Sequence, residues 1–223
     1  MRRRPAIAAV AILLLVLSGC SADRRPRVLL LGDSLMAEAS VAAQKDLRAH
    51  GFRTHAKALP GTGFLDTGTD WSRLIRVQVR RFHPDVVVAL FSGNYNEPKP
   101  GIPWESDAFY AAWRDASIRN QKLMTADGAV QYWVTILPQR PPPRETVGRR
   151  LNQMYAELGR TIDGRSALAG PGDSYAESLP GPDGKMAVVR QADGIHLTDA
   201  GALLLGARIS AGVRQGPHPK HHR

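Results

Sequence analysis

Two short polar stretches far apart in the chain hold the side chains that acyl-transfer chemistry requires. They are Gly32-Asp33-Ser34-Leu35 and Asp193-Gly194-Ile195-His196. A serine hydroxyl is a weak nucleophile, so it needs an adjacent base, and a third group must hold that base in one tautomer. Each stretch alone also suits an ordinary turn or helix cap. Together they predict Ser34 as nucleophile, His196 as base and Asp193 as the carboxylate that orients the base.

The elements around these stretches suit such a site. Ser34 follows the apolar run 27–31, which is typical of a strand buried on both faces of a parallel sheet, and a helix is predicted over residues 37–50. This order presents the serine at the carboxyl edge of the sheet, where open α/β folds bind ligands. The second stretch lies just before Thr198, the expected N-cap of a closing helix over residues 199–213.

The rest of the chain alternates predicted strands with predicted helices, which is typical of a doubly wound α/β domain. Apolar and β-branched runs predict strands at residues 52–59, 85–91 and 130–137. Helices are predicted over residues 71–82, 107–126 and 144–162. The segment 165–189 is rich in Gly, Pro and Ser, and we expect it to hold a fifth short strand within a long loop.

The two polar stretches resemble the first and last sequence blocks of the SGNH, or GDSL, hydrolase family. The resemblance spans roughly residues 27–213 in the block order of the family. It implies a flavodoxin-like three-layer α/β/α fold with a mostly parallel five-stranded sheet. It also implies a serine hydrolase that forms an acyl-enzyme on Ser34, and no cofactor is expected.

The second block of the family is a glycine after the second strand. Gly61 is the match, with Gly63 as the alternative, although a plain glycine turn fits Pro60-Gly61-Thr62-Gly63 equally well. In the family this glycine donates its backbone N–H to the oxyanion, and the N–H of Ser34 does the same.

The third block places an asparagine after the third strand. Asn94 is the match and Asn96 the alternative in Ser92-Gly93-Asn94-Tyr95-Asn96. Its side-chain amide would complete the oxyanion hole. Ser92 and Tyr95 stand where the family usually has Gly and Asp.

The N-terminus reads as an export signal. Arg2, Arg3 and Arg4 precede an apolar run over residues 6–17, which is too short for a typical membrane-spanning helix. Leu17-Ser18-Gly19-Cys20 resembles the bacterial lipobox, and Cys20 is the single cysteine of the chain. We expect a signal peptide over residues 1–19, lipidation of Cys20, a tether over residues 20–26 and a protein anchored to the outer face of the cell membrane. Cleavage nearby with release of the protein is the alternative.

The chain has a formal net charge of +10 over 223 residues. Its length suits one α/β domain, and the resemblance implies that this is a hydrolase domain over residues 27–214. A basic, histidine-containing tail over residues 215–223 follows, for which no metal site is named. The positive charge suits anionic lipid or an anionic envelope polymer. Nucleic acid is not expected, because the basic residues are dispersed and export argues against it. We expect a monomer.

Three functions follow from these residues. The first is a serine esterase acting on acetylated carbohydrate or lipid of the cell envelope. The second is an envelope O-acyltransferase with the same triad, and the third is a non-catalytic binding module. The loops 95–104 and 138–144 are expected to border the substrate site. Aromatic and arginine side chains there could bind a sugar or an anionic acyl donor, and ordinary packing is the interpretation favoured for any single one of them.

Overall fold

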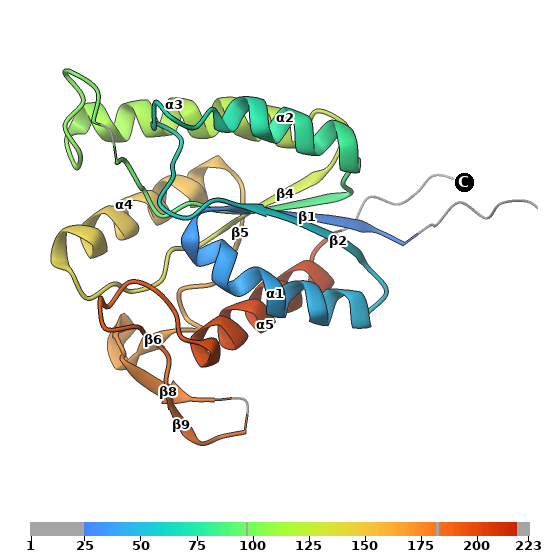
Figure 1. Ribbon diagram of the computed structural model, residues 1–223, viewed down its shortest axis with the longest axis vertical. Coiled ribbons are helices and arrows are strands. Elements are labelled where there is room, and N and C mark those ends of the chain that lie inside the picture. The colour runs from blue at the N-terminus through green and yellow to red at the C-terminus, as the bar shows by residue number, and fades with distance from the viewer. Residues whose placement is uncertain (1–24, 97, 182, 218–223) are drawn as a thin grey trace, which may run out of the picture.

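The computed structural model describes residues 25–217, with the exception of residues 97 and 182. The predicted signal peptide, Cys20 and most of the tail lie outside the described residues. Helices cover both faces of one five-stranded sheet, so the chain forms the three-layer α/β/α architecture that the sequence predicts (Figure 1).

All strands of the central sheet are parallel. They are β1 (Arg27–Gly32), β2 (Arg53–Ala58), β3 (Val86–Leu90), β4 (Val130–Val134) and β5 (Arg160–Ile162), in the order β2-β1-β3-β4-β5. β1 and β3 lie side by side at the centre, and their apolar residues are buried because helices cover both faces. The chain extends from β1 to one side and then returns to β3 on the other. The carboxyl ends of β1 and β3 therefore form the switch point at which such sheets bind ligands.

The helices divide between the two faces of the sheet (Figure 1). They are α1 (Ser34–Ala49), α2 (Trp71–Phe82), α3 (Asp107–Met124), α4 (Pro142–Leu158) and α5 (Asp199–Gln215). α1 and α5 pack together on one face, whereas α2 and α3 cover the other. α4 lies beside α3, where Trp113 Nε1 donates a hydrogen bond to the Tyr155 hydroxyl at 3.0 Å.

The position of the fifth strand corrects the sequence analysis. The predicted helix over residues 144–162 ends at Leu158, and Arg160–Ile162 forms β5. The helix is capped by Gly159, a residue of low helix propensity, and the β-branched Thr161 and Ile162 that follow suit a strand.

The segment 165–189 therefore contributes no strand to the central sheet. Its described residues form two small hairpins instead. The first pairs β6 (Ala169–Gly170) with β7 (Ser174–Tyr175) across the short 3-10 helix η1 (Pro171–Asp173), and the second pairs β8 (Ser178–Pro180) with β9 (Met186–Val188).

Candidate active site

A tight junction between β1 and α1 places Ser34 at the carboxyl edge of the sheet. Asp33 is the N-cap of α1, and its Oδ1 accepts the Leu35 N–H at 3.1 Å. Gly32 allows β1 to approach β3, because a Cβ there would lie 2.2 Å from the Leu90 carbonyl oxygen. Ser34 is thus held as the first residue of α1, beside the switch point of the sheet.

The structure brings the three predicted triad residues together. His196 Nε2 lies 2.9 Å from Ser34 Oγ, and His196 Nδ1 lies 2.5 Å from Asp193 Oδ2. The other oxygen of Asp193 accepts the backbone N–H groups of Ile195 at 2.8 Å and His196 at 3.0 Å. The loop before α5 therefore fixes the carboxylate, which in turn orients the imidazole toward the serine.

The environment of Asp193 keeps its carboxylate ionised. Burial opposes ionisation, but the hydrogen bond from the His196 side chain and those from the Ile195 and His196 N–H groups outweigh it and lower the pKa of Asp193 to about 2. An ionised Asp193 makes Nδ1 of His196 the donor, so Nε2 is left to accept the Ser34 proton.

Asp33 is not a member of the triad but supports the site through hydrogen bonds with its neighbours. It is fully buried, and burial raises its pKa, whereas hydrogen bonds from Ser92 and Leu35 oppose the rise. Asp33 Oδ2 accepts the N–H and the hydroxyl of Ser92, each at 2.6 Å, and the Asn94 amide at 3.2 Å. Ser92, which departs from the usual glycine of the family, therefore supplies hydrogen bonds to a buried carboxylate.

The structure distinguishes the two candidate glycines by their surroundings. Gly61 has φ +73° and lines the cavity beside Ser34. Gly63 donates its N–H to Asp66 Oδ2 at 2.6 Å, and a Cβ there would lie 2.0 Å from the Asn94 carbonyl oxygen. Gly63 is thus a close-packing position whose N–H is engaged, whereas Gly61 lines the cavity beside Ser34.

The two candidate asparagines both line the same cavity. Asn94 is buried, and its Nδ2 donates to Asp33 and, at 3.5 Å, to the Thr62 carbonyl. Asn96 is exposed, and its amide donates to the Gly61 carbonyl. Asn94 is therefore the more rigidly held of the two amides.

Arg144, in the first turn of α4, is a site residue that the sequence analysis assigned to packing. Its Nη1 donates to Asn94 Oδ1 at 3.0 Å. A guanidinium only donates hydrogen bonds, so this contact directs the oxygen of the Asn94 amide toward Arg144 and its Nδ2 away from Arg144. A cation in the first turn of a helix is unusual, because the helix dipole disfavours it there, and that signal was present in the sequence.

Two further residues hold the loop that carries His196, and the sequence analysis predicted neither. Glu38, one turn after Ser34 on α1, accepts the Leu197 N–H at 2.9 Å, and burial raises its pKa. Arg190 is buried and donates to the carbonyls of Ile195 at 3.1 Å and Pro138 at 2.8 Å. Burial lowers the pKa of Arg190 to about 10, so it stays charged at neutral pH.

A cavity of about 370 Å³ opens beside the nucleophile. Its lining includes Ser34, Gly61, Asn94, Asn96, Arg144 and His196. Within the part of the chain that the structure describes, no group of three or more His, Cys, Asp or Glu side chains is placed to hold a metal ion. The arrangement combines a hydroxyl, a base and the carboxylate that orients the base, which suits nucleophilic attack on a carbonyl carbon.

Comparison with known proteins identifies a family and a fold. Residues 27–211 match the model of a family described as "Protein of unknown function (DUF459)". No curated protein matches the chain.

Several solved structures share the fold. A GDSL-like lipase from Bacteroides thetaiotaomicron has a TM-score of 0.57 at 14% identity, over 85% of this chain and 88% of that one. An acetyl esterase has a TM-score of 0.58 at 15% identity, over 85% and 97%. The periplasmic domain of a lipopolysaccharide acetyltransferase from Salmonella ser. Paratyphi A has a TM-score of 0.62 at 14% identity, over 88% and 87%. The predicted SGNH hydrolase fold is confirmed.

Proposed function

The chain belongs to the DUF459 family, and from its SGNH hydrolase fold and the geometry around Ser34 we propose that it is a serine esterase. The observation that carries the proposal is the continuous line of hydrogen bonds from Ser34 Oγ through His196 to the Asp193 carboxylate. A non-catalytic binding module would have no need of an imidazole held in this tautomer between a hydroxyl and a carboxylate.

Acylation begins with Ser34. As its Oγ bonds to the ester carbonyl carbon, His196 Nε2 takes the hydroxyl proton. The carbonyl oxygen becomes an oxyanion that accepts hydrogen bonds from the N–H groups of Ser34 and Gly61 and from Asn94 Nδ2. The ionised Asp193 stabilises the imidazolium that results.

Collapse of the tetrahedral intermediate completes acylation, and the same residues then catalyse deacylation by water. The tetrahedral intermediate collapses, the bond to the alcohol oxygen breaks, and His196 returns its proton to that oxygen. Water then attacks the acyl-Ser34 carbonyl while His196 takes one of its protons. A second tetrahedral intermediate releases the carboxylic acid and restores the Ser34 hydroxyl.

Transfer to a second alcohol is the alternative reaction of the same site. The Salmonella domain that shares the fold is an acetyltransferase, and other proteins that share it are acetyl xylan esterases. A sugar hydroxyl that reached the acyl-enzyme before water would receive the acyl group. An increase in acylated glycan when an acceptor is supplied would identify transfer, and an unchanged hydrolysis rate without acylated glycan would identify an esterase.

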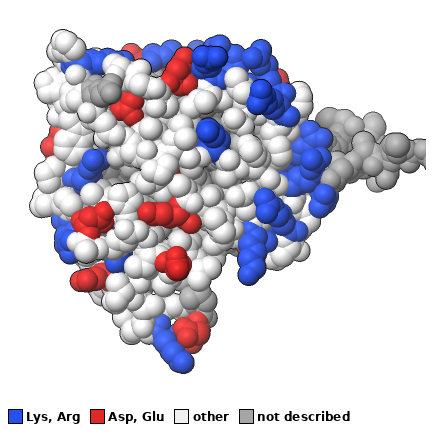
Figure 2. All heavy atoms as spheres, viewed as in Figure 1, with Lys and Arg blue, Asp and Glu red and all other residues white. Residues whose placement is uncertain are grey.

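The proposal places the protein at the cell envelope, anchored through a lipid on Cys20 and acting on acylated carbohydrate or lipid there. The charge distribution supports it, because on the face shown in Figure 2 the Lys and Arg side chains are denser, and Asp and Glu scarcer, toward the end where the described chain begins. β1 starts there and ends at the site, so the catalytic edge faces away from that end. No helix within residues 25–217 is long and apolar enough to cross a membrane.

Labelling with a fluorophosphonate tests the esterase proposal. The full chain, purified in detergent, is treated with the reagent and analysed by mass spectrometry beside Ser34→Ala and His196→Ala variants. One adduct on Ser34, greatly slowed in the His196 variant, is expected together with hydrolysis of short-chain aryl esters. Folded wild-type protein that forms no adduct and hydrolyses no ester would contradict the proposal.

A further inference from the structure

Arg144 gives the cavity beside Ser34 a permanent positive charge. Its side chain is half-buried and lines the cavity together with Asn94 and His196. Among the described residues of that lining, no other side chain is charged at every physiological pH, and none is a carboxylate. A guanidinium keeps its charge in such surroundings.

The described contacts of Arg144 are with neutral groups. Nη1 donates to Asn94 Oδ1 at 3.0 Å, and the guanidinium carbon lies 5.1 Å from the centre of the Trp104 ring. These two contacts position the guanidinium group of Arg144. They leave donors of the guanidinium for a further acceptor, because Arg has five N–H groups.

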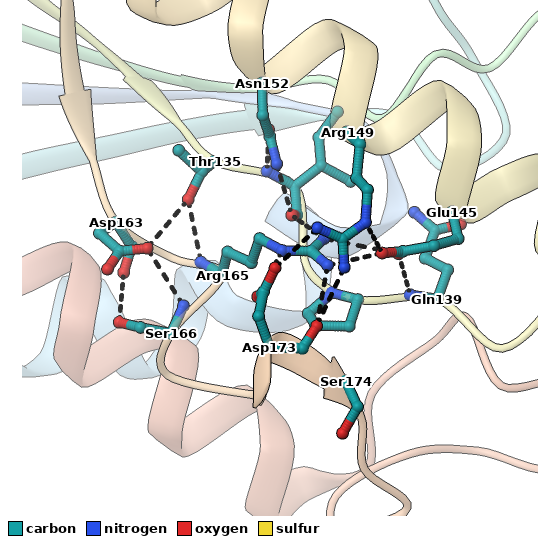
Figure 3. A network of polar contacts seen from close by, with 12 residues as sticks. Thr135, Gln139, Glu145, Arg149, Asn152, Asp163, Arg165, Ser166, Asp173 and Ser174 are labelled. Atoms are coloured by element: carbon teal, nitrogen blue, oxygen red, sulfur yellow. Dashed lines mark hydrogen bonds and ion pairs between the residues drawn. The ribbon is translucent and has the colours of Figure 1, made fainter. Parts of the chain in front are cut away.

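The acidic side chains near Arg144 are engaged by other donors. Glu145, its neighbour in the chain, forms ion pairs with Arg165 at 2.5 Å and Arg149 at 2.6 Å (Figure 3). It also accepts the Gln139 N–H at 2.9 Å. The network in Figure 3 thus holds the first turn of α4 in place and engages both oxygens of the Glu145 carboxylate with other donors.

Asp33 attracts Arg144 electrostatically but lies behind Asn94. Its oxygens already accept four hydrogen bonds, from Leu35, from the N–H and the hydroxyl of Ser92 and from Asn94. The cavity therefore presents a cation whose charge no carboxylate within the described lining neutralises. Planar Arg forks bind carboxylates in a bidentate manner and more strongly than they bind neutral acceptors.

We propose that Arg144 selects ester substrates that carry a carboxylate close to the scissile bond. The inference rests on the proposed esterase function. The carboxylate could belong to the acyl group, as in the half-ester of a dicarboxylic acid, or to the alcohol, as in an acylated uronic acid. Both place an anion within a few bonds of the carbonyl carbon, and Arg144 is in direct hydrogen-bond contact with Asn94, the proposed oxyanion donor, at 3.0 Å.

Matched pairs of esters test the inference on the full chain. In the acyl arm, kcat/KM for mono-p-nitrophenyl succinate is compared with that for p-nitrophenyl butyrate. In the alcohol arm, an O-acetylated methyl glucuronoside is compared with the same methyl glucoside. We expect a preference for the anionic ester of ~10-fold to 100-fold in at least one arm, because a charge-assisted hydrogen bond contributes that much. The arm that shows it identifies the side of the ester that carries the carboxylate.

Arg144→Gln is the variant that removes the charge and keeps an amide donor for Asn94. Its ratio of anionic to neutral turnover should fall toward one, whatever the absolute rates. Arg150→Gln is the matched control on the same helix, since Arg150 binds Asp107 outside the cavity, and its ratio should remain that of the wild type. If the alcohol arm shows the preference, a second measurement needs no variant: glucuronate should slow fluorophosphonate labelling of wild-type Ser34 more than glucose does.

Failure of this inference can be distinguished from failure of the proposed esterase function. Turnover of neutral esters with no anionic preference in either arm would overturn the role of Arg144 and leave the esterase intact, as would a preference that persists in Arg144→Gln. Absence of all ester turnover and of the Ser34 adduct would overturn the proposed function itself.

Discussion

Hydrogen bonds join three side chains from different parts of the sequence, Arg144, Asn94 and Asp33, beside Ser34. Arg144 donates to the oxygen of the Asn94 amide, and the nitrogen of that amide donates to Asp33. A cation at one end and a buried acid at the other hold the amide in one orientation. The candidate oxyanion donor is therefore positioned before any substrate binds, which is the condition for electrostatic stabilisation of a transition state.

The difference between Asn94 and Asn96 leads to the first prediction. Asn94→Ala should lower kcat by about 100-fold to 1,000-fold, because it removes a preorganised donor to the oxyanion. Asn96→Ala should cause a much smaller loss, since the Asn96 side chain is exposed, whereas the Asn94 amide is buried and oriented by Arg144. Steady-state kinetics on one aryl ester measure both, and equal losses in the two variants would contradict the assignment of Asn94.

The second prediction concerns pH and Asp193. Its folded-state pKa of about 2 lies below the ordinary value of 3.8, so its contribution to stability is present above the ordinary value and is lost as the pH falls through the folded one. Asp193→Asn should lower kcat/KM by ~10,000-fold at neutral pH, as expected when the base loses its orienting carboxylate. The wild type should also lose stability relative to this variant between pH 4 and pH 2.

Denaturant unfolding of both proteins at pH 7, 4 and 2.5 measures that change. Circular dichroism of the variant at pH 7 is the control for its fold. A stability difference that stays constant down to pH 2.5 would show that Asp193 lacks the lowered pKa.

At the scale of the elements, the site depends on a connection between the His196 loop and the end of β4. Arg190 makes it by donating to the carbonyls of Ile195, within the loop, and Pro138, after the strand. Its Nε has no hydrogen-bond partner among the described residues. Burying a cation whose partners are neutral carbonyls costs free energy of folding. We therefore interpret Arg190 as a residue that fixes the two segments relative to each other.

The third prediction is that Arg190→Met lowers kcat more than it raises KM. Methionine has a similar length and flexible packing, but it leaves both carbonyls without their donor and frees the loop that carries His196. Labelling of Ser34 by fluorophosphonate should slow in parallel. Arg208→Met, a change at an exposed arginine of α5, is the control. Unchanged kinetics in the Arg190 variant would show that the loop is held by other contacts.

At the scale of the whole molecule, the site and the start of the described chain lie at opposite ends of the central sheet (Figure 1). The described chain starts at Arg25, only a few residues after Cys20. A lipid on Cys20 would therefore hold the more basic end of the molecule close to the membrane, where anionic lipids attract Lys and Arg. The catalytic edge would then face the polymers beyond the membrane surface.

The fourth prediction follows from this orientation. In bacterial cells that express the full chain, palmitate should label the wild type and not Cys20→Ser, and the wild type should remain in the membrane fraction. Extraction at high salt is the control for electrostatic attachment, because salt screens surface charge and does not remove a lipid. A wild-type protein without incorporated palmitate would contradict lipidation.

The features that depend on neighbours in the chain followed from the sequence alone. The buried strand before Ser34, the helix after it and the pairing of Asp193 with His196 three residues later are local patterns, and so the fold class and the triad candidates were predicted. Each of these features depends on hydrophobic periodicity or on short spacing along the chain, so it can be recognised without knowledge of the tertiary contacts.

Tertiary structure decided the features that depend on contacts between distant residues. Gly63 packs against the Asn94 carbonyl, the Asn94 amide is oriented from α4, and the 3-residue β5 exists because it pairs with β4. Arg144 and Arg190 likewise acquire their partners only when separate elements meet. A sequence shows that such donors exist, but hydrogen bonds across tens of residues are selected by packing, which brings together atoms that no local pattern relates.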